Sequence, residues 1–186
     1  MYMILDSAIF HAFYSFATSV AYLEWIYIFL ASYLPYLIVA AFLYELVKIS
    51  DAKKKIYIFL LSILAVVVSR GIVAYAFDFF LHRARPFVAL GISPLISQGA
   101  TSSFPSGHMS FLIPIGLASF LIDRRLGIWL SSSVFIVGLA RIAVGVHWPS
   151  DILGGILIGA VTYLLVYKLL PNPEGESAKL KTKSAK

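Results

Sequence analysis

Two residues that can form a nucleophile pair, His147 and Asp151, lie four positions apart near the end of the chain. Pro149 and Ser150 between them are typical of the start of a helix, so the carboxylate can reach the imidazole. An aspartate that accepts a hydrogen bond from Nδ1–H fixes the histidine tautomer and leaves Nε2 free to attack. We therefore expect covalent catalysis, with His147 as the nucleophile and Asp151 as its orienting partner.

A second group of residues predicts an anion site. Ser106 and Gly107 open an apolar segment, where free backbone N–H groups at the start of a helix favour an anion and glycine permits close approach. Arg85 and Arg141 can add bidentate contacts. The expected anion is phosphate, and His108, beside this cradle, is the expected general acid for a departing oxygen.

No metal or other cofactor is needed for chemistry that uses two histidines. A metal triad of His108, His147 and Asp151 is the alternative, but no cluster of further carboxylates accompanies these residues. The chain has no cysteine, which excludes thiolate metal sites and cysteine nucleophiles. We therefore expect an enzyme without cofactors.

The elements that position these residues are expected to be membrane helices. Of the 186 residues, 60% are hydrophobic and 13% are charged, which excludes a soluble globular domain. Apolar runs of about twenty residues recur, the length that crosses a bilayer as a helix. The sequence therefore predicts an all-α polytopic membrane helix bundle, built as one domain over residues 1–170.

Five transmembrane helices are expected, at residues 22–47, 56–81, 106–122, 126–146 and 150–169. The first twenty residues carry a polar stripe opposite an apolar one, which favours a helix lying at the membrane surface; a sixth span is the alternative. The loop 82–104 is long enough to be functional. Residues 171–186 are expected to form a disordered cytoplasmic tail.

Two further features of the spans carry expectations. Arg70 lies inside the second span, where a charge paired within the bundle is expected and a direct contact with a lipid headgroup is the alternative. Gly155 and Gly159 form a small-residue step on the last span, which predicts close helix packing.

The distribution of positive charge predicts the orientation. Most of the fifteen Lys and Arg residues lie in the loop 48–55, at residues 124–125 and at the end of the chain, so this face is expected to be cytoplasmic. The net charge of +6 follows from this rule and does not indicate nucleic acid binding. The predicted site then faces the extracytoplasmic side of the cell (inner) membrane, with membrane lipid as its surroundings.

Three motifs in order, Arg85-Pro86, Pro105-Ser106-Gly107-His108 and Arg141 with His147 and Asp151, resemble the tripartite signature of the type-2 phosphatidic acid phosphatase superfamily. The resemblance covers roughly residues 22–170. It implies a phosphohistidine mechanism on lipid phosphates. By residue it implies His147 as nucleophile, Asp151 as its partner, His108 as acid, and a phosphate site of Arg85, Ser106, Gly107 and Arg141.

The chain departs from that signature at two positions. Asp78 stands where the family begins its first motif with a lysine, and Ala140 replaces the serine before Arg141. Arg83 is a candidate for the missing positive charge at the phosphate. Alternatively, Asp78 pairs with Arg83 or His82 and has no direct part.

Within the superfamily, the small bundle and the HRARPF segment at 82–87 are similar to the bacterial undecaprenyl pyrophosphate phosphatases. Many of those enzymes have aspartate where Gly107 stands. The resemblance implies undecaprenyl (polyprenyl) diphosphate as substrate; phosphatidic acid and phosphatidylglycerophosphate are the alternatives. A protein that binds or translocates lipid phosphates without turnover is a different class. The oligomeric state is left open.

Overall fold

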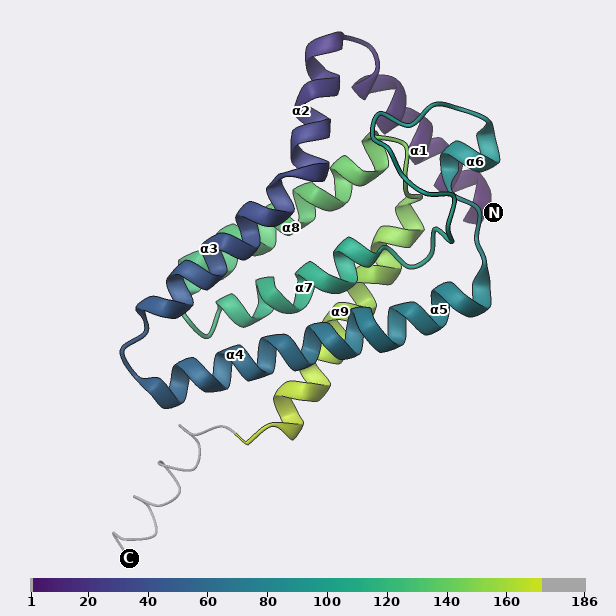
Figure 1. Ribbon diagram of the computed structural model, residues 1–186. Helices are drawn as coiled ribbons and strands as arrows, with labels where there is room; N and C mark the ends of the chain where they lie inside the picture. The colour runs from purple at the N-terminus through teal and green to yellow at the C-terminus, as the bar shows by residue number, and fades with distance from the viewer. Residues whose placement is uncertain (1, 172–186) are drawn as a thin grey trace, which may run out of the picture.

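The computed structural model describes residues 2–171, and every regular element in that range is a helix (Figure 1). The predicted all-α class is therefore confirmed. Most of the predicted tail, residues 171–186, lies outside the described residues. The helices are α1 Tyr2–Ala17, α2 Ala21–Ser32, α3 Leu34–Lys48, α4 Ala52–Val66, the π-helix η1 Val67–Val73, α5 Ala74–Leu81, α6 Pro86–Leu90, α7 Gly107–Ser119, α8 Arg124–Ala143 and α9 Pro149–Leu169.

Local sequence explains where several helices begin. The side chain of Asp51 accepts hydrogen bonds from the backbone N–H groups of Lys53 and Lys54 at 2.8 and 3.2 Å, which caps α4. Asp123 caps α8 in the same way through Leu126. Pro149 occupies the first turn of α9, where a missing N–H has no cost.

Helix α7 lies inside the bundle and packs against α4, α8 and α9. Its Met109 and Leu112 are fully buried. A Cβ atom added at Gly155 would lie 2.6 Å from the Ser106 carbonyl oxygen, and one at Gly159 would lie 2.9 Å from Ile113 Cβ. The predicted close packing of α9 is therefore confirmed, and α7 is the helix that needs it.

The outer surface of the bundle is apolar. Large hydrophobic side chains are exposed along α3, α4, α8 and α9, as expected of helices that contact lipid. Three helical stretches are long and apolar enough to cross a membrane, Ala52–Leu90, Arg124–Ala143 and Pro149–Leu169. They correspond to the predicted spans 56–81, 126–146 and 150–169.

The other two predicted spans differ from expectation. The stretch 22–47 is broken at Tyr33, where α2 gives way to α3 just before Pro35. Helix α7 has 13 residues and is shorter than the predicted 106–122. At about 1.5 Å per residue it does not reach across a hydrocarbon core of about 30 Å. The count of five spans therefore stays a prediction.

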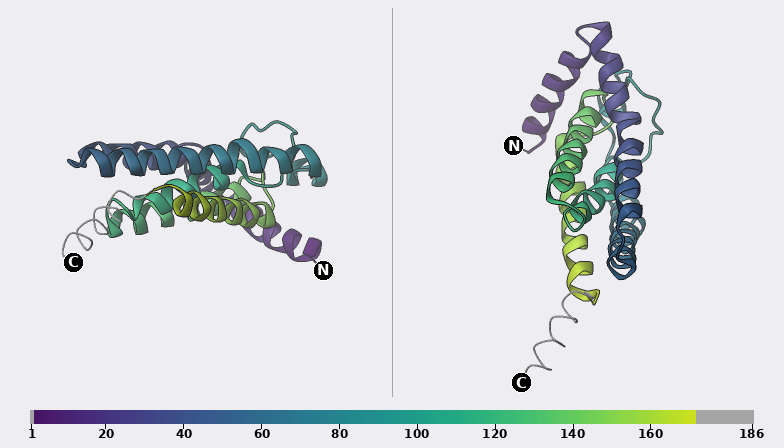
Figure 2. Two further views of the ribbon diagram at one scale, coloured as in Figure 1. Left: turned by 90° about the horizontal axis from the view of Figure 1, so that it is seen from below. Right: turned by 90° about the vertical axis from the view of Figure 1, so that its left-hand side faces the viewer.

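The N-terminal helix folds back against the bundle. It meets α2 at a bend of 118° and packs against α8 and α9. Its Phe10 is fully buried against the Trp148 ring. Figure 2 shows α4 and α5 in one layer, α7 to α9 in a second, and α1 extending beside the second layer. This contact places α1 at the end of the bundle where the motif residues meet.

Candidate active site

The motif residues meet at one end of the bundle, around a cavity of about 620 Å³. The loop between α6 and α7, the start of α7 and the turn between α8 and α9 converge there (Figure 1). Five of the predicted site residues line the cavity: Arg85, Gly107, His108, Arg141 and His147. The structure therefore brings together residues that are up to 62 positions apart in the sequence.

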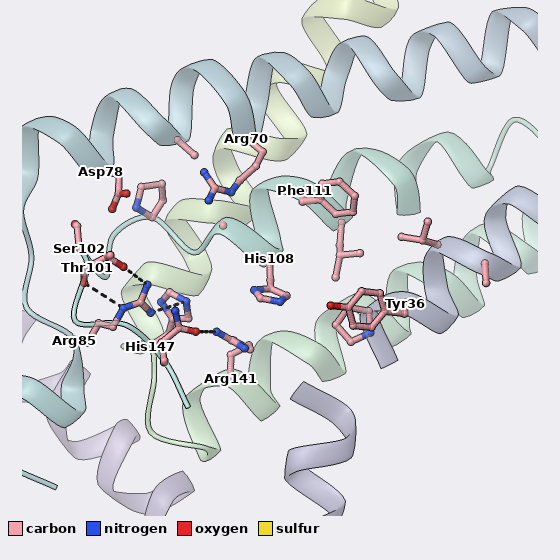
Figure 3. A pocket seen from close by; sticks show the side chains of 18 of the residues that line it. Tyr36, Arg70, Asp78, Arg85, Thr101, Ser102, His108, Phe111, Arg141 and His147 are labelled. Atoms are coloured by element: carbon pink, nitrogen blue, oxygen red, sulfur yellow. Dashed lines mark hydrogen bonds between the residues drawn. The ribbon is translucent and has the colours of Figure 1, made fainter. Parts of the chain in front are cut away.

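The imidazole of His147 is 2% exposed and points its Nε2 atom toward Arg85 (Figure 3). Arg85 Nη1 lies 3.3 Å from Nε2, and a guanidinium can only donate. Nε2 therefore accepts, and the ring proton is on Nδ1. Nδ1 lies 3.5 Å from Asp151 Oδ2, without a hydrogen bond but close enough for electrostatic orientation. This tautomer puts the Nε2 lone pair on the cavity side, where Arg85 Nη1 is its hydrogen-bond donor.

Asp151 is fully buried behind His147 at the start of α9. Its carboxylate accepts hydrogen bonds from Trp148 N–H at 2.7 Å, from Arg83 Nη1 at 2.6 Å and from the Ser103 hydroxyl. A carboxylate with this many donors is fixed in position and stays ionised. Asp151 is therefore held as an anion beside the nucleophile.

Arg83 lies behind the nucleophile pair and is not among the residues that line the cavity. Its guanidinium bridges Asp151 and Asp6 of α1, with Nη2 at 2.5 Å from Asp6 Oδ2. Asp6 also accepts from the backbone N–H of Ser150 at 2.9 Å. The side chain of Arg83 is thus committed to two carboxylates. The geometry favours a positioning role over the predicted phosphate contact.

Asp78 faces the cavity from α5 (Figure 3). The ion pairs of Arg83 are made with Asp6 and Asp151, and no ion pair joins Asp78 to His82 in the described residues. The expected alternative pairing of Asp78 with Arg83 or His82 is therefore wrong. Asp78 adds negative charge to the wall of the cavity.

Arg85 and Arg141 are buried cations on one side of the cavity. Arg85 is held by the carbonyl and hydroxyl oxygens of Thr101, at 3.2 and 3.3 Å, and by the Val146 carbonyl at 3.0 Å. Arg141 Nη2 donates to Gln98 Oε1 at 2.9 Å, while its Nε is buried without a partner. A buried donor without a partner is costly unless a ligand supplies one.

The environment also keeps His147 neutral. Burial lowers the pKa of His147 to about 4, and the positive charges of Arg141 and Arg85 act in the same direction against Asp151. The guanidinium groups of Arg85 and Arg141 stay charged at neutral pH. At neutral pH the site therefore combines a neutral imidazole with two cations.

The start of α7 completes the polar part of the cavity. Gly107 and His108 line it, and the buried hydroxyl of Ser106 directly behind them has no partner. The first N–H groups of a helix have no partner within the helix and attract anions. Guanidinium groups and the start of α7 thus face the same space as His147 Nε2.

The other end of the cavity is apolar. Tyr36, Val39 and Leu43 of α3 and Phe111 of α7 line it, and Figure 3 shows His108 between this end and the arginines. The cavity therefore offers separate surroundings for a charged headgroup and an apolar chain. Within residues 2–171 no three His, Asp or Glu side chains gather in an arrangement that could hold a metal ion.

Several residues of the site were not predicted from the sequence. Ser103, Thr101 and Gln98 lie in a loop whose spacing to the motifs gives no signal. Asp6 could have been recognised from the sequence, because a carboxylate in an apolar segment normally has a partner or a function. Its partner follows only from the packing of α1 against α9, which no local pattern predicts.

Fold and site together define a helical membrane protein with a buried histidine–aspartate pair that faces a cationic cavity. The chain belongs to the PAP2 superfamily, whose model matches residues 56–174. The predicted superfamily is therefore confirmed.

Relatives and a solved structure agree with this assignment. The chain is 31% identical over 97 residues to the undecaprenyl-diphosphatase BcrC of Bacillus subtilis, which covers 52% of this chain and 50% of that protein. It is 29% identical over 121 residues to a lipid A 1-phosphatase of Rhizobium etli, covering 57% and 52%. The chain thus spans about half the length of the curated relatives it matches. The crystal structure of Aquifex aeolicus LpxE shares the fold, with a TM-score of 0.71, 22% identity and coverage of 88% and 95%.

Proposed function

We propose that the protein is an integral membrane phosphatase that removes the terminal phosphate of undecaprenyl (polyprenyl) diphosphate through a phosphohistidine on His147. The observation that carries this proposal is a neutral, buried histidine whose Nε2 lies beside Arg85 in a cavity that Arg141, with its unpartnered Nε, also lines. A nucleophile backed by a fixed carboxylate is suited to covalent phosphoryl transfer.

Each site residue then has one role. Nε2 of His147 attacks the terminal phosphorus in line, and a P–N bond forms as the bond to the bridging oxygen breaks. Arg85, Arg141 and the N–H groups of Gly107 and His108 stabilise charge on the equatorial oxygens. The negative charge of the bound substrate favours the protonated form of His108, which gives its proton to the departing lipid monophosphate.

The second half of the reaction regenerates the enzyme. Water attacks the phosphohistidine, the neutral His108 accepts its proton, and orthophosphate leaves as the P–N bond to His147 breaks. The phosphoryl group is transferred without a metal, because arginines and a helix terminus supply the positive charge. The proposal therefore predicts full activity in excess EDTA.

The choice of a polyprenyl diphosphate is supported by three features: the apolar end of the cavity, the HRARPF segment and similarity to a relative named undecaprenyl-diphosphatase. The lipid A 1-phosphatase relative and the general Pro-Ser-Gly-His form of the second motif support a phosphomonoester such as phosphatidic acid or phosphatidylglycerophosphate as the second candidate.

We further propose that the site opens on the extracytoplasmic side of the cell (inner) membrane. The cavity lies at the end of the bundle opposite the basic residues of the α3–α4 connection and the start of α8 (Figure 1). Basic loops remain on the cytoplasmic side. With this orientation, the enzyme would recycle the polyprenyl carrier used in wall synthesis.

Phosphate release by the purified full chain tests the proposal. Undecaprenyl diphosphate and phosphatidic acid are offered side by side in excess EDTA, with His147→Ala as the inactive variant and His11→Ala, on the exposed face of α1, as the matched control. Release from the diphosphate that only His147→Ala abolishes would support the proposal. Preference for phosphatidic acid would support the second candidate, and no release from either would support a binding protein.

A further inference from the structure

Arg70 is a cation of the cavity that the proposed mechanism does not use. It lies in η1, the single stretch of π-helix in the described chain, between α4 and α5. A π-helical turn inserts an extra residue into a helix, changes the direction of its side chains and is frequent at functional sites. In this protein the turn carries Arg70 onto the cavity wall (Figure 3).

The guanidinium of Arg70 lies directly over Gly107 at the start of α7. A Cβ atom added at Gly107 would lie 2.7 Å from Arg70 Nε and 3.1 Å from Cζ. The absence of a side chain at position 107 therefore makes room for this arginine. The glycine of the second motif and the π-helix act together to bring a cation to the phosphate cradle.

Arg70 has no hydrogen bond or ion pair in residues 2–171, and its side chain is exposed to the cavity. The expected structural ion pair inside the bundle is therefore absent from the part of the chain described. A cation without a partner at this depth is expensive unless a ligand supplies the negative charge.

The position of Arg70 relative to the general acid identifies which part of a ligand it meets. Figure 3 shows Arg70 on one side of His108 and Arg141 with His147 on the other. In the proposed reaction, the transferred phosphoryl group lies beside His147, Arg85 and Arg141. The leaving group that His108 protonates then extends from His108 toward Arg70.

We propose that Arg70 forms a second phosphate subsite, which binds the lipid-proximal phosphate of a diphosphate substrate and selects diphosphates over monoesters. This inference rests on the proposed phosphatase function and names the feature of the substrate that the site recognises. Three arginines then face the negative charge of two linked phosphates.

The test compares polyprenyl diphosphate and the polyprenyl monophosphate of the same chain length as substrates of Arg70→Gln. Removing one charge-assisted hydrogen bond to the diphosphate predicts a fall in kcat/KM of about 10- to 100-fold for that substrate. The monophosphate should change by less than about twofold. Arg124→Gln, an arginine at the far end of α8, is the matched control and should leave both substrates unchanged.

Equal losses of kcat/KM on both substrates would overturn the subsite, as would no loss on either. Arg70→Lys keeps a positive charge and should restore part of the diphosphate preference, which separates binding from a folding defect. Gly107→Ala should mimic Arg70→Gln on the diphosphate because its Cβ displaces Arg70, although it also perturbs the cradle.

Binding without turnover separates this inference from the proposed function. Thermal stabilisation of the full chain by inorganic pyrophosphate is compared with that by orthophosphate, in wild type and Arg70→Gln. The subsite predicts that pyrophosphate binds at least about tenfold more tightly in the wild type, and that Arg70→Gln removes the difference. Equal binding of the two ions by the wild type would overturn the subsite even if lipid phosphates are hydrolysed.

Discussion

The two sides of His147 differ in how their polar groups are satisfied. Behind the imidazole, Asp151, Arg83 and Asp6 form a continuous network in which each charged group has a charged partner. On the cavity side, Arg141 Nε is buried without a partner, and so is the Ser106 hydroxyl directly behind Gly107. Both regions lie within one end of the bundle.

This difference separates positioning from binding. A satisfied buried network fixes side chains, whereas unpartnered buried donors require a ligand to complete them. Arg83 and Arg85 are two positions apart in the sequence, yet Arg83 belongs to the rear network and Arg85 to the cavity. Motif proximity alone therefore does not assign a role to an arginine.

The largest effect should come from the residue that the two regions share. Replacing His147 with Ala removes the nucleophile, and we expect kcat to fall by about 10³-fold or more. The variant should bind orthophosphate with an affinity near that of the wild type, because the front donors remain. Single-turnover phosphate release, with binding followed by thermal shift, measures both. Unchanged turnover would show that another residue is attacked.

Breaking the rear network should affect turnover more than binding. Arg83→Gln removes the bridge between Asp6 and Asp151, and we expect kcat to fall about 10- to 100-fold while KM changes by less than about threefold. Asp6→Asn should also lower kcat with little change in KM, but by a smaller factor than Arg83→Gln. The control is Asp51→Asn, which keeps the cap of α4 at the opposite end of the bundle. A rise in KM with unchanged kcat would place Arg83 at the phosphate instead.

The acid limb of the pH–rate profile should reflect the charge in front of His147. Its pKa is lowered to about 4 by burial and by Arg141 and Arg85, so the neutral nucleophile persists as pH falls and is lost only near pH 4. Arg85→Gln removes one opposing charge, and the limb should move toward higher pH. Ionisation of the substrate is common to both proteins and cancels in the comparison. If the acid limb lies at the same pH in Arg85→Gln as in the wild type, Arg85 does not lower the pKa of His147.

The smallest effect should come from the groups that hold the front arginines. Thr101→Val removes one acceptor of Arg85 and keeps the shape of the side chain. We expect KM to rise about two- to fivefold, since the Thr101 and Val146 carbonyls still hold the guanidinium. Steady-state kinetics on the diphosphate provide the measurement. Thr162→Val, in α9 and outside the cavity lining, is the matched control and should not change KM.

The residues on the cavity side of His147 were predicted from the sequence better than the network behind it. Residues of the three motifs are fixed by the chemistry of phosphate, so their types and order were enough to bring His147, His108, Arg85 and Arg141 together. The rear network depends on a contact between α1 and α9, and the pattern of α1 indicated only its two faces. No local feature of residues near 6 predicts a partner near 83 or 151.

For the helices too, features with a local signal in the sequence were predicted and features that depend on packing were not. The long apolar runs at 56–81, 126–146 and 150–169 were predicted well because their signal is local. The break at Tyr33, the short α7 and the π-helix η1 come from packing, which hydrophobic periodicity does not record. The π-helix is the most consequential of these, since it decides whether Arg70 faces lipid or the cavity.

Trapping the covalent intermediate tests the central claim most directly. Purified protein is mixed with polyprenyl diphosphate labelled at its terminal phosphate, quenched in alkali and digested, and the labelled peptide is identified. We predict an acid-labile phosphate on the peptide that contains His147, absent from His147→Ala and unaffected by EDTA. Turnover without a labelled protein, or a label that persists in His147→Ala, would contradict the account.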